Sequence, residues 1–298
     1  MKPITDLKFQ IPGKTFLVGE YAVLVGGTAL GLATTPCFEF TFGGGASAFH
    51  PESPAGKYFS SRGEMQALQF TDPYQERGIQ GGFGRSTAEY LAAITTDLLE
   101  KKISVFEILN TYRNLTASGT TRPSGMDLVF QFLGGITLAD QQLQMFQNFD
   151  WNFPNLDFFL ISSGVKIQTH THLESLKLDS LLDLPELSAT VANFFVQNNE
   201  TEFLYHMNSW CELLKSKKLT HANSLEIRTQ LESTEVIKLV KPCGALGADV
   251  LAVFFDRADQ NQVKKILVDQ KYSVCAGSDD LSAGLVSQLR PYWSQHVG

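Results

Sequence analysis

The sequence predicts an α/β fold, because segments with strand patterns and segments with helix patterns alternate along it. Residues Cys37–Phe42 alternate in the way that a half-buried strand does. The runs 157–163 and 250–255 are almost continuously apolar, as buried strands are. Residues 86–102 instead place apolar side chains near the helical period, with no Pro or Gly among them. A chain of 298 residues has room for one large domain or for two of ordinary size.

The other elements follow in chain order. A short strand is predicted at Thr15–Val18. The stretch 43–80 is rich in Gly, Ser and Pro, so we expect hairpins and loops there. Residues 104–115 have the apolar spacing of a second helix, and several amphipathic helices are predicted between 173 and 235. The part from 260 to 286 alternates helix and strand signals.

Composition excludes several classes of protein. A net charge of -7 argues against a nucleic-acid-binding protein, which needs a basic face. No stretch has the length and apolar character of a membrane span, and the first residues lack the apolar run of a signal peptide. The 4 cysteines are dispersed, without metal-ligand spacing, so we expect free thiols in a reducing cytoplasm.

The stretch Gly81–Tyr90, GGFGRSTAEY, is the first candidate for a functional site. Its glycines allow a tight turn, and Ser86 and Glu89 have the spacing of a capping box at a helix start. Exposed N–H groups and the positive end of the helix dipole would make this junction a phosphate site. The alternative interpretation is an ordinary loop-to-helix turn.

Charged residues beside other turns are further candidates. Lys14 follows Pro12-Gly13, and Asp127 follows the turn 123–125 just before an apolar helix. The plain alternatives are a solvated lysine and an acidic residue that complements a helix dipole. His170 and His172 lack a third ligand nearby, which favours surface histidines over a metal site.

A second glycine loop, Gly244–Gly247, precedes the strand at 250–255. Because the strand follows the loop, this is not the strand–glycine–helix order of a dinucleotide-binding fold. The sequence also contains no GxxxxGK[ST] phosphate loop.

Three segments in this order resemble the GHMP kinase superfamily of small-molecule kinases for galactose, homoserine, mevalonate and phosphomevalonate: PGKTFLVGEYAVL, GGFGRSTA and KPCGALGAD. RPSGMD is similar to mevalonate kinases, whereas GEYAVL and KPCGALGAD are closer to phosphomevalonate kinases. The resemblance implies a two-lobed fold with residues 1–160 holding ATP and the catalytic residues, and residues 161–298 forming the second lobe. It also implies a left-handed βαβ-type phosphate-loop unit in the first lobe and a ferredoxin-like second lobe.

The resemblance further implies roles for individual residues. Asp127 matches the general base for the substrate hydroxyl, and Lys14 matches the lysine beside it. The residues that match the ATP-binding loop are Gly82, Phe83, Gly84, Arg85, Ser86 and Thr87, and Ser86 also matches the serine that meets Mg²⁺. The residues that match substrate-side positions are Glu20, Tyr21, Thr171, Gly244, Ala245 and Gly247.

Two features depart from the family pattern. Arg85 stands where relatives have a serine, and the stretch 114–121 lacks the acidic residue that helps to hold Mg²⁺ in mevalonate kinases. Our hypothesis is that Arg85 supplies positive charge to the phosphates. In the third segment, Leu246 and Ala248 stand where glycines are usual.

The resemblance therefore implies an ATP- and Mg²⁺-dependent kinase that phosphorylates a hydroxyl of mevalonate in isoprenoid biosynthesis. A phosphomevalonate kinase, or a non-catalytic relative that binds a nucleotide or metabolite, is the alternative, and the decarboxylase branch is a weaker third option. The expected partners are a small-molecule substrate and a second copy in a homodimer, with neither nucleic acid nor membrane involved.

Overall fold

Two antiparallel sheets form the framework of the molecule. The computed structural model describes residues 7–43, 49–63, 68–79, 81–117, 123–140, 142–165 and 176–293. The strands of the first sheet are β1 (Lys8–Val18), β2 (Thr28–Phe42), β3 (Leu68–Thr71), β4 (Ile136–Asp140) and β5 (Met145–Phe149). The strands of the second sheet are β6 (Leu156–Ser162), β7 (Ile237–Cys243), β8 (Val250–Asp256) and β9 (Val274–Gly277).

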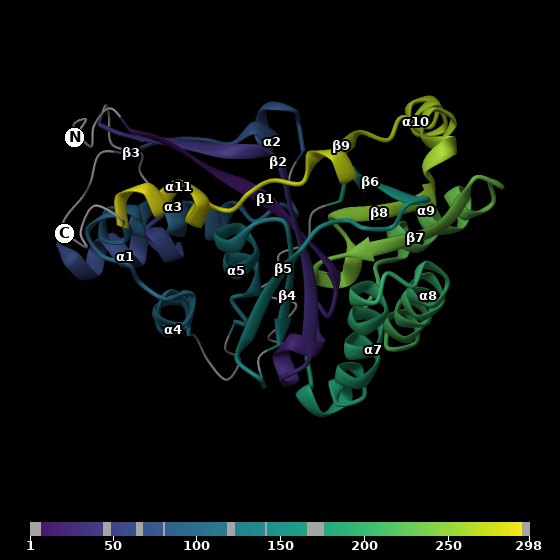
Figure 1. Ribbon diagram of the computed structural model, residues 1–298, viewed down its shortest axis with the longest axis horizontal. Helices are drawn as coiled ribbons and strands as arrows, with labels where there is room; N and C mark the ends of the chain where they lie inside the picture. The colour runs from purple at the N-terminus through teal and green to yellow at the C-terminus, as the bar shows by residue number, and fades with distance from the viewer. Residues whose placement is uncertain are drawn as a thin grey trace.

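The first sheet has the order β1-β2-β4-β5, with β3 pairing the far end of β2, and the second has the order β7-β8-β6-β9 (Figure 1). Mixed helices and strands confirm the predicted fold class. The handedness of the phosphate-loop connection and the ferredoxin-like character of the second lobe stay predictions.

Helices cover these sheets. The α-helices are α1 (Pro54–Arg62), α2 (Pro73–Glu76), α3 (Arg85–Glu100), α4 (Val105–Thr116), α5 (Met126–Leu133), α7 (Leu184–Val196), α8 (Glu200–Ser216), α9 (Ala222–Glu232), α10 (Gln260–Asp269) and α11 (Leu285–Trp293). The short 3-10 helices are η2 (Ala22–Val25), η3 (Leu178–Leu181), η4 (Ala245–Gly247), η5 (Arg257–Asp259) and η6 (Ser278–Asp280).

Helix α5 lies directly on β1 and β2. Phe130 packs so tightly over Gly31 that a Cβ at position 31 would be 2.2 Å from its ring. The same ring makes an edge contact with Phe16 of β1, at 5.0 Å between centroids. This close contact holds the N-terminus of α5 over the strand that carries Lys14.

The second sheet packs against the helices that precede β7 and follow β8. On the α8 side of this sheet, the rings of Trp151, Phe203 and Phe254 form an aromatic cluster, in which Phe203 contacts both of the others. The last helix, α11, returns to the first half of the chain, where it contacts α3, α5 and β1 (Figure 1). There the Trp293 indole donates a hydrogen bond to the Leu98 carbonyl at 2.6 Å. The predicted division near residue 160 stays a prediction, but the final helix packs with the first sheet.

The structure differs from the sequence prediction in the stretch 43–80. We expected hairpins and loops there, and β3 does pair antiparallel with β2, but the helices α1 and α2 also lie in it. The reason is local capping: the Ser53 hydroxyl accepts a hydrogen bond from the Gly56 N–H, and Pro54 occupies the first helical turn. The Asp72 carboxylate caps α2 by accepting hydrogen bonds from the N–H groups of Tyr74 and Gln75, and Pro73 is the first residue of this helix.

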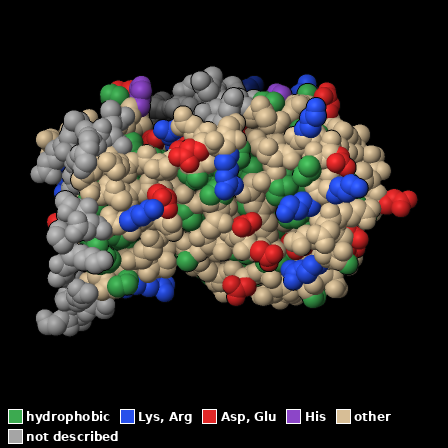
Figure 2. Space-filling model, turned by 90° about the horizontal axis from the view of Figure 1, so that it is seen from above, with side chains coloured by type: hydrophobic (Ala, Val, Ile, Leu, Met, Phe, Trp, Pro, Cys, Tyr) green, Lys and Arg blue, Asp and Glu red, His purple; other side chains and the backbone are tan. Residues whose placement is uncertain are grey.

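The described residues can be checked for membrane-spanning helices and for the distribution of surface charge. None of their helices combines the length and apolar character needed to cross a lipid bilayer. On the face shown in Figure 2, positive and negative side chains are interspersed rather than gathered into one patch.

Candidate active site

Lys14 and Asp127 form an ion pair, with 2.9 Å between Lys14 Nζ and Asp127 Oδ2. Lys14 lies on β1 opposite Ala33, and its side chain is only 9% exposed, whereas that of Asp127 is 35% exposed. Asp127 is in the first turn of α5, which begins after Gly125 in a left-handed conformation. A carboxylate at this position is stabilised by the helix dipole. The sequence prediction that these two residues meet is therefore confirmed, and the carboxylate remains open to solvent.

The glycine turn lies against the same lysine. Gly84 has φ 82°, and a Cβ built on it would be 2.8 Å from Lys14 Cγ, so only glycine fits without a shift. The backbone N–H of Lys14 donates a hydrogen bond to the Phe83 carbonyl at 3.0 Å. Gly82 also has a positive φ, and its Cβ would be 2.6 Å from Val250 Cγ2. The turn is thus fitted between β1 and the start of β8.

Helix α3 begins directly after this turn, but the predicted capping box is wrong. Gly84 is the N-cap residue and provides no side-chain cap, while Ser86 lies inside the first helical turn and is exposed. Without a capping side chain, the first N–H groups of the helix keep their capacity to bind an anion. Glu89 is instead paired with Arg85, at 2.8 Å between Arg85 Nε and Glu89 Oε1.

Arg85 points toward α2. Its guanidinium lies 2.6 Å from the Gln75 side-chain oxygen and 3.4 Å from an Asp72 carboxylate oxygen. Together with Glu89, these contacts pair the charge that we expected to face phosphates. Sequence reasoning could not foresee the contacts with Asp72 and Gln75, because these residues begin a helix in the stretch predicted as hairpins and loops.

Gln131 is the residue that sequence reasoning missed. It is fully buried one helical turn after Asp127, on the same face of α5. Its Oε1 accepts a hydrogen bond from the Thr87 hydroxyl at 2.5 Å. Its Nε2 donates to the carbonyls of Pro12 at 2.9 Å and Gly84 at 3.2 Å. One side chain therefore joins β1, the glycine turn, α3 and α5. A single Gln within the apolar run LVFQFL was the only available signal.

The third segment, KPCGALGAD, runs from the end of β7 through η4 to the start of β8. The Tyr21 hydroxyl accepts a hydrogen bond from the Leu246 N–H at 2.7 Å. Leu246 has φ 52°, a left-handed conformation that glycine adopts without cost, which accounts physically for glycine being usual there. Gly247 also has a positive φ and lies against Pro242.

Comparisons with known proteins can be set beside this geometry. No family model and no curated protein matches the chain. Solved structures do match it: Streptococcus pneumoniae phosphomevalonate kinase in complex with phosphomevalonate and AMPPNP has a TM-score of 0.71 at 13% identity, covering 91% of this chain and 99% of the other. Methanococcus jannaschii mevalonate kinase has a TM-score of 0.63 at 13% identity, covering 91% and 97%. Lactococcus lactis galactokinase has a TM-score of 0.63 at 10% identity, covering 93% and 94%.

The chain has the GHMP kinase fold. The resemblance carried by the three sequence segments is therefore confirmed at the level of the fold. Within that fold, the glycine turn packs against Lys14, which is paired with Asp127, and against the end of the third segment at Asp249.

Glu20 and Tyr21 are buried within this GHMP fold. Glu20 forms an ion pair with Lys241, at 2.5 Å between Glu20 Oε1 and Lys241 Nζ, and both side chains are almost fully buried. The second carboxylate oxygen of Glu20 has no hydrogen-bond partner within the described part of the chain. In this structure both residues connect β1 to β7 and η4. Their contact with a substrate stays a prediction.

The remaining predicted residues fall into two groups. Ala245 and Gly247 lie in η4, beside Gly244, which has open space around its Cα. Thr171 lies outside the described residues, as do His170 and His172. No cluster of three or more His, Cys, Asp or Glu suited to a metal ion occurs among the residues that the structure describes.

Proposed function

We propose that this protein is an ATP-dependent kinase that transfers the γ-phosphoryl group of ATP to a hydroxyl of a small molecule, with mevalonate as the first candidate. The observation that carries the proposal is the 2.9 Å ion pair between Lys14 and Asp127, set beside the glycine turn. A protein that only binds nucleotide has no use for a solvent-open carboxylate paired with a buried lysine at this place. The fold supports the same reaction class, because its solved examples include mevalonate, phosphomevalonate and galactose kinases.

In the proposed reaction, Asp127 accepts the proton of the acceptor hydroxyl as that oxygen bonds to the γ-phosphorus. The bond from the γ-phosphorus to the bridging oxygen of ATP breaks, and ADP leaves with the electron pair. Lys14 stabilises the negative charge on the transferring group. Backbone N–H groups at the start of α3 hold the phosphates. Phosphoryl transfer depends mostly on such positioning and charge stabilisation.

ATP is the proposed cofactor, together with Mg²⁺. The exposed hydroxyl of Ser86, in the first turn of α3, is the protein group that would contact the metal. An oxygen donor fits Mg²⁺, which commonly keeps several waters and is bound through few protein groups plus substrate phosphates. When bound, Mg²⁺ supplies charge neutralisation on the phosphates.

The acceptor is proposed from the solved neighbours. Mevalonate kinase of L. major was solved with R-mevalonate, and the S. pneumoniae phosphomevalonate kinase with phosphomevalonate. We place mevalonate first because RPSGMD is similar to mevalonate kinases, and phosphomevalonate second. The protein would then act in isoprenoid biosynthesis in the cytoplasm, and we propose a homodimer.

A non-catalytic nucleotide-binding relative is the second candidate. It is favoured by the pairing of Arg85 with Asp72 and Glu89, which leaves less free positive charge for phosphates. The two candidates agree on nucleotide binding and differ on turnover.

A coupled ADP-release assay separates them. Mevalonate, phosphomevalonate, homoserine and galactose are each supplied with ATP and Mg²⁺, and AMPPNP affinity is measured by calorimetry. We expect turnover with mevalonate or phosphomevalonate, and a loss of at least about 100-fold in kcat for Asp127→Asn. AMPPNP binding without turnover on any acceptor would support the second candidate. An absence of AMPPNP binding would refute both.

A further inference from the structure

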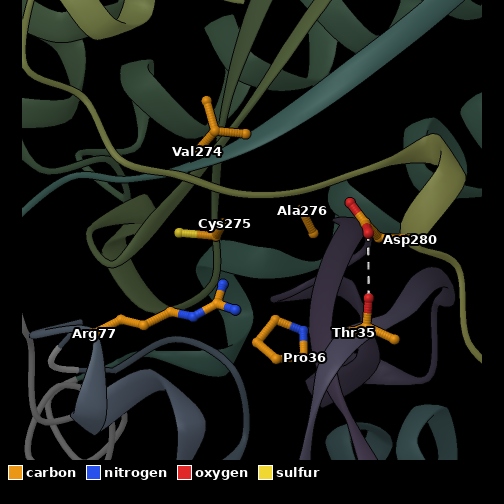
Figure 3. Close-up of a pocket in the computed structure, with 7 residues that line it drawn as sticks. All are labelled: Thr35, Pro36, Arg77, Val274, Cys275, Ala276 and Asp280. Atoms are coloured by element: carbon orange, nitrogen blue, oxygen red, sulfur yellow. Dashed lines mark hydrogen bonds between the residues drawn. The ribbon is translucent and has the colours of Figure 1, made fainter.

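A cavity of about 360 Å³ lies between elements of the two sheets, apart from the residues assigned to ATP or the acceptor. Its walls come from Thr35 and Pro36 of β2, from the end of α2, from β9 and from η6 (Figure 3). This volume is within the range of sites that hold small metabolites.

Arg77 supplies an unpaired cation to this cavity. It is an exposed residue, and its guanidinium points from one side toward the interior of the cavity (Figure 3). Within the residues that the structure describes, no hydrogen bond or ion pair engages this side chain. By contrast, Arg62, Arg85 and Arg228 are each paired with a carboxylate. A planar guanidinium with free donors at a cavity suits a carboxylate group.

Asp280 lies on the opposite side of the cavity from Arg77 (Figure 3). Its Oδ1 accepts a hydrogen bond from the Thr35 hydroxyl at 3.2 Å, and its Oδ2 accepts one from the Gly277 N–H at 2.8 Å. Each carboxylate oxygen can accept a further bond. This end of the cavity therefore favours a hydrogen-bond donor and disfavours an anion.

The side chains between the two charges are apolar or, in one case, a thiol. They include those of Pro36, Val274 and Ala276 together with the Cys275 side chain. Burial raises the pKa of the Cys275 thiol to about 12, so at neutral pH the thiol carries no charge that could compensate Arg77. Such side chains favour a short carbon chain between the two ends of a ligand.

We propose that this cavity binds a small aliphatic amino or hydroxy acid, with the carboxylate on Arg77 and the N–H or O–H donor on Asp280. Both kinds of ligand have a carboxylate at one end and a hydrogen-bond donor at the other, separated by a short apolar chain. The site is independent of the proposed phosphoryl transfer, because none of its lining residues takes part in that reaction.

The test is an NMR titration of the isotope-labelled full chain. The probes are the ω-amino acids from glycine to 5-aminopentanoate, the matching ω-hydroxy acids, and alkyl carboxylates and alkylamines that lack one end. We expect saturable shifts of the Val274–Ala276 amides with at least one two-ended probe, and weaker binding of both one-ended series. The amino and hydroxy series show which donor the site prefers.

Arg77→Gln should weaken the best probe by about tenfold or more, the effect of losing hydrogen bonds to a charged group. Arg257→Gln, which removes an exposed arginine elsewhere, is the matched control for net charge and should bind as the parent does. Asp127→Asn should also bind as the parent does, which separates this site from the proposed kinase site. Absence of saturable shifts with every two-ended probe, or unchanged binding in Arg77→Gln, would overturn the proposal.

Discussion

The hydroxyl of Thr87 donates a 2.5 Å hydrogen bond to Oε1 of Gln131, and both side chains are buried. This bond fixes the first turn of α3 against the helix that carries Asp127. Because Gln131 Nε2 also binds the Pro12 carbonyl, the same amide sets the position of β1 just before Lys14. The geometry of the candidate site thus depends on a residue that contacts no proposed ligand.

The first prediction concerns Gln131→Met, which keeps the volume but removes every hydrogen bond of the amide. We expect a loss of about 1–3 kcal/mol in unfolding free energy, because the buried Pro12 carbonyl loses its Gln131 donor and the Thr87 hydroxyl keeps only the Gly84 carbonyl as a partner. We also expect AMPPNP affinity to fall about tenfold as the glycine turn loosens. Denaturant unfolding and calorimetry measure the two effects.

Thr87→Val is combined with Gln131→Met in a double-mutant cycle, in which both single variants and the double variant are compared with the parent. Residues in direct contact should show a coupling of about 0.5 kcal/mol or more in both stability and nucleotide affinity. If stability falls in these variants while nucleotide affinity equals that of the parent, Gln131 supports the fold alone and does not position the turn.

The second prediction concerns Arg85. Its guanidinium is bound by Asp72, Gln75 and Glu89, so its charge is largely compensated. We expect Arg85→Ala to weaken AMPPNP binding by only about two- to fivefold, the size of a partly screened charge effect. Asp72→Asn, which removes one compensating charge, should strengthen binding slightly. Unchanged nucleotide affinity and turnover in Arg85→Ala would exclude Arg85 as a source of charge for the phosphates.

The candidate site shows what sequence can predict and what it cannot. Lys14 and Asp127 were predicted because each follows a turn and matches a family motif, and their contact was confirmed. The partners of Gln131 lie 119 residues away at Pro12 and 44 away at Thr87, so no local pattern reveals them. The orientation of Arg85 depends on α2, which in sequence is a short Pro-containing segment within a glycine-rich stretch. Periodicity predicted α3 and α4, whereas the capped helices α1 and α2 were missed and the long-range polar contacts needed the fold.

The third prediction compares two glycines of the third segment. Gly244 and Gly247 both have a positive φ, of 81° and 54°, so alanine is strained at either position. They differ in space: a Cβ at Gly247 would be 2.5 Å from Pro242 Cβ, whereas nothing lies within 4 Å at Gly244. We expect Gly244→Ala to cost about 1–3 kcal/mol from backbone strain alone, because φ 81° with ψ -163° is a conformation that essentially only glycine adopts. Gly247→Ala should cost about 1–3 kcal/mol more, because of the added clash. Equal destabilisation in urea unfolding would contradict this packing.

The fourth prediction is a pH dependence of stability set by Cys243. Its thiol donates to the Lys241 carbonyl at 3.3 Å, and burial raises its pKa from 9.0 to about 11. Between these two pH values the unfolded thiol has lost its proton while the folded thiol keeps it. The folded state then binds more protons, so the unfolding free energy falls as pH rises, by up to about 1.4 kcal/mol per pH unit from this group.

Urea unfolding of the parent and of Cys243→Ala between pH 7.5 and pH 10.5 compares two proteins that differ at this thiol and in the pKa of Lys241, which the Cys243 charge raises. We expect a constant difference in unfolding free energy up to about pH 8, where the thiol is protonated in both states. Above pH 9 the parent should lose stability more steeply than the variant. Cys37→Ala is the control, because Cys37 is less buried and should change the slope less. Parallel curves for the parent and Cys243→Ala would show that this thiol ionises equally in the folded and unfolded protein.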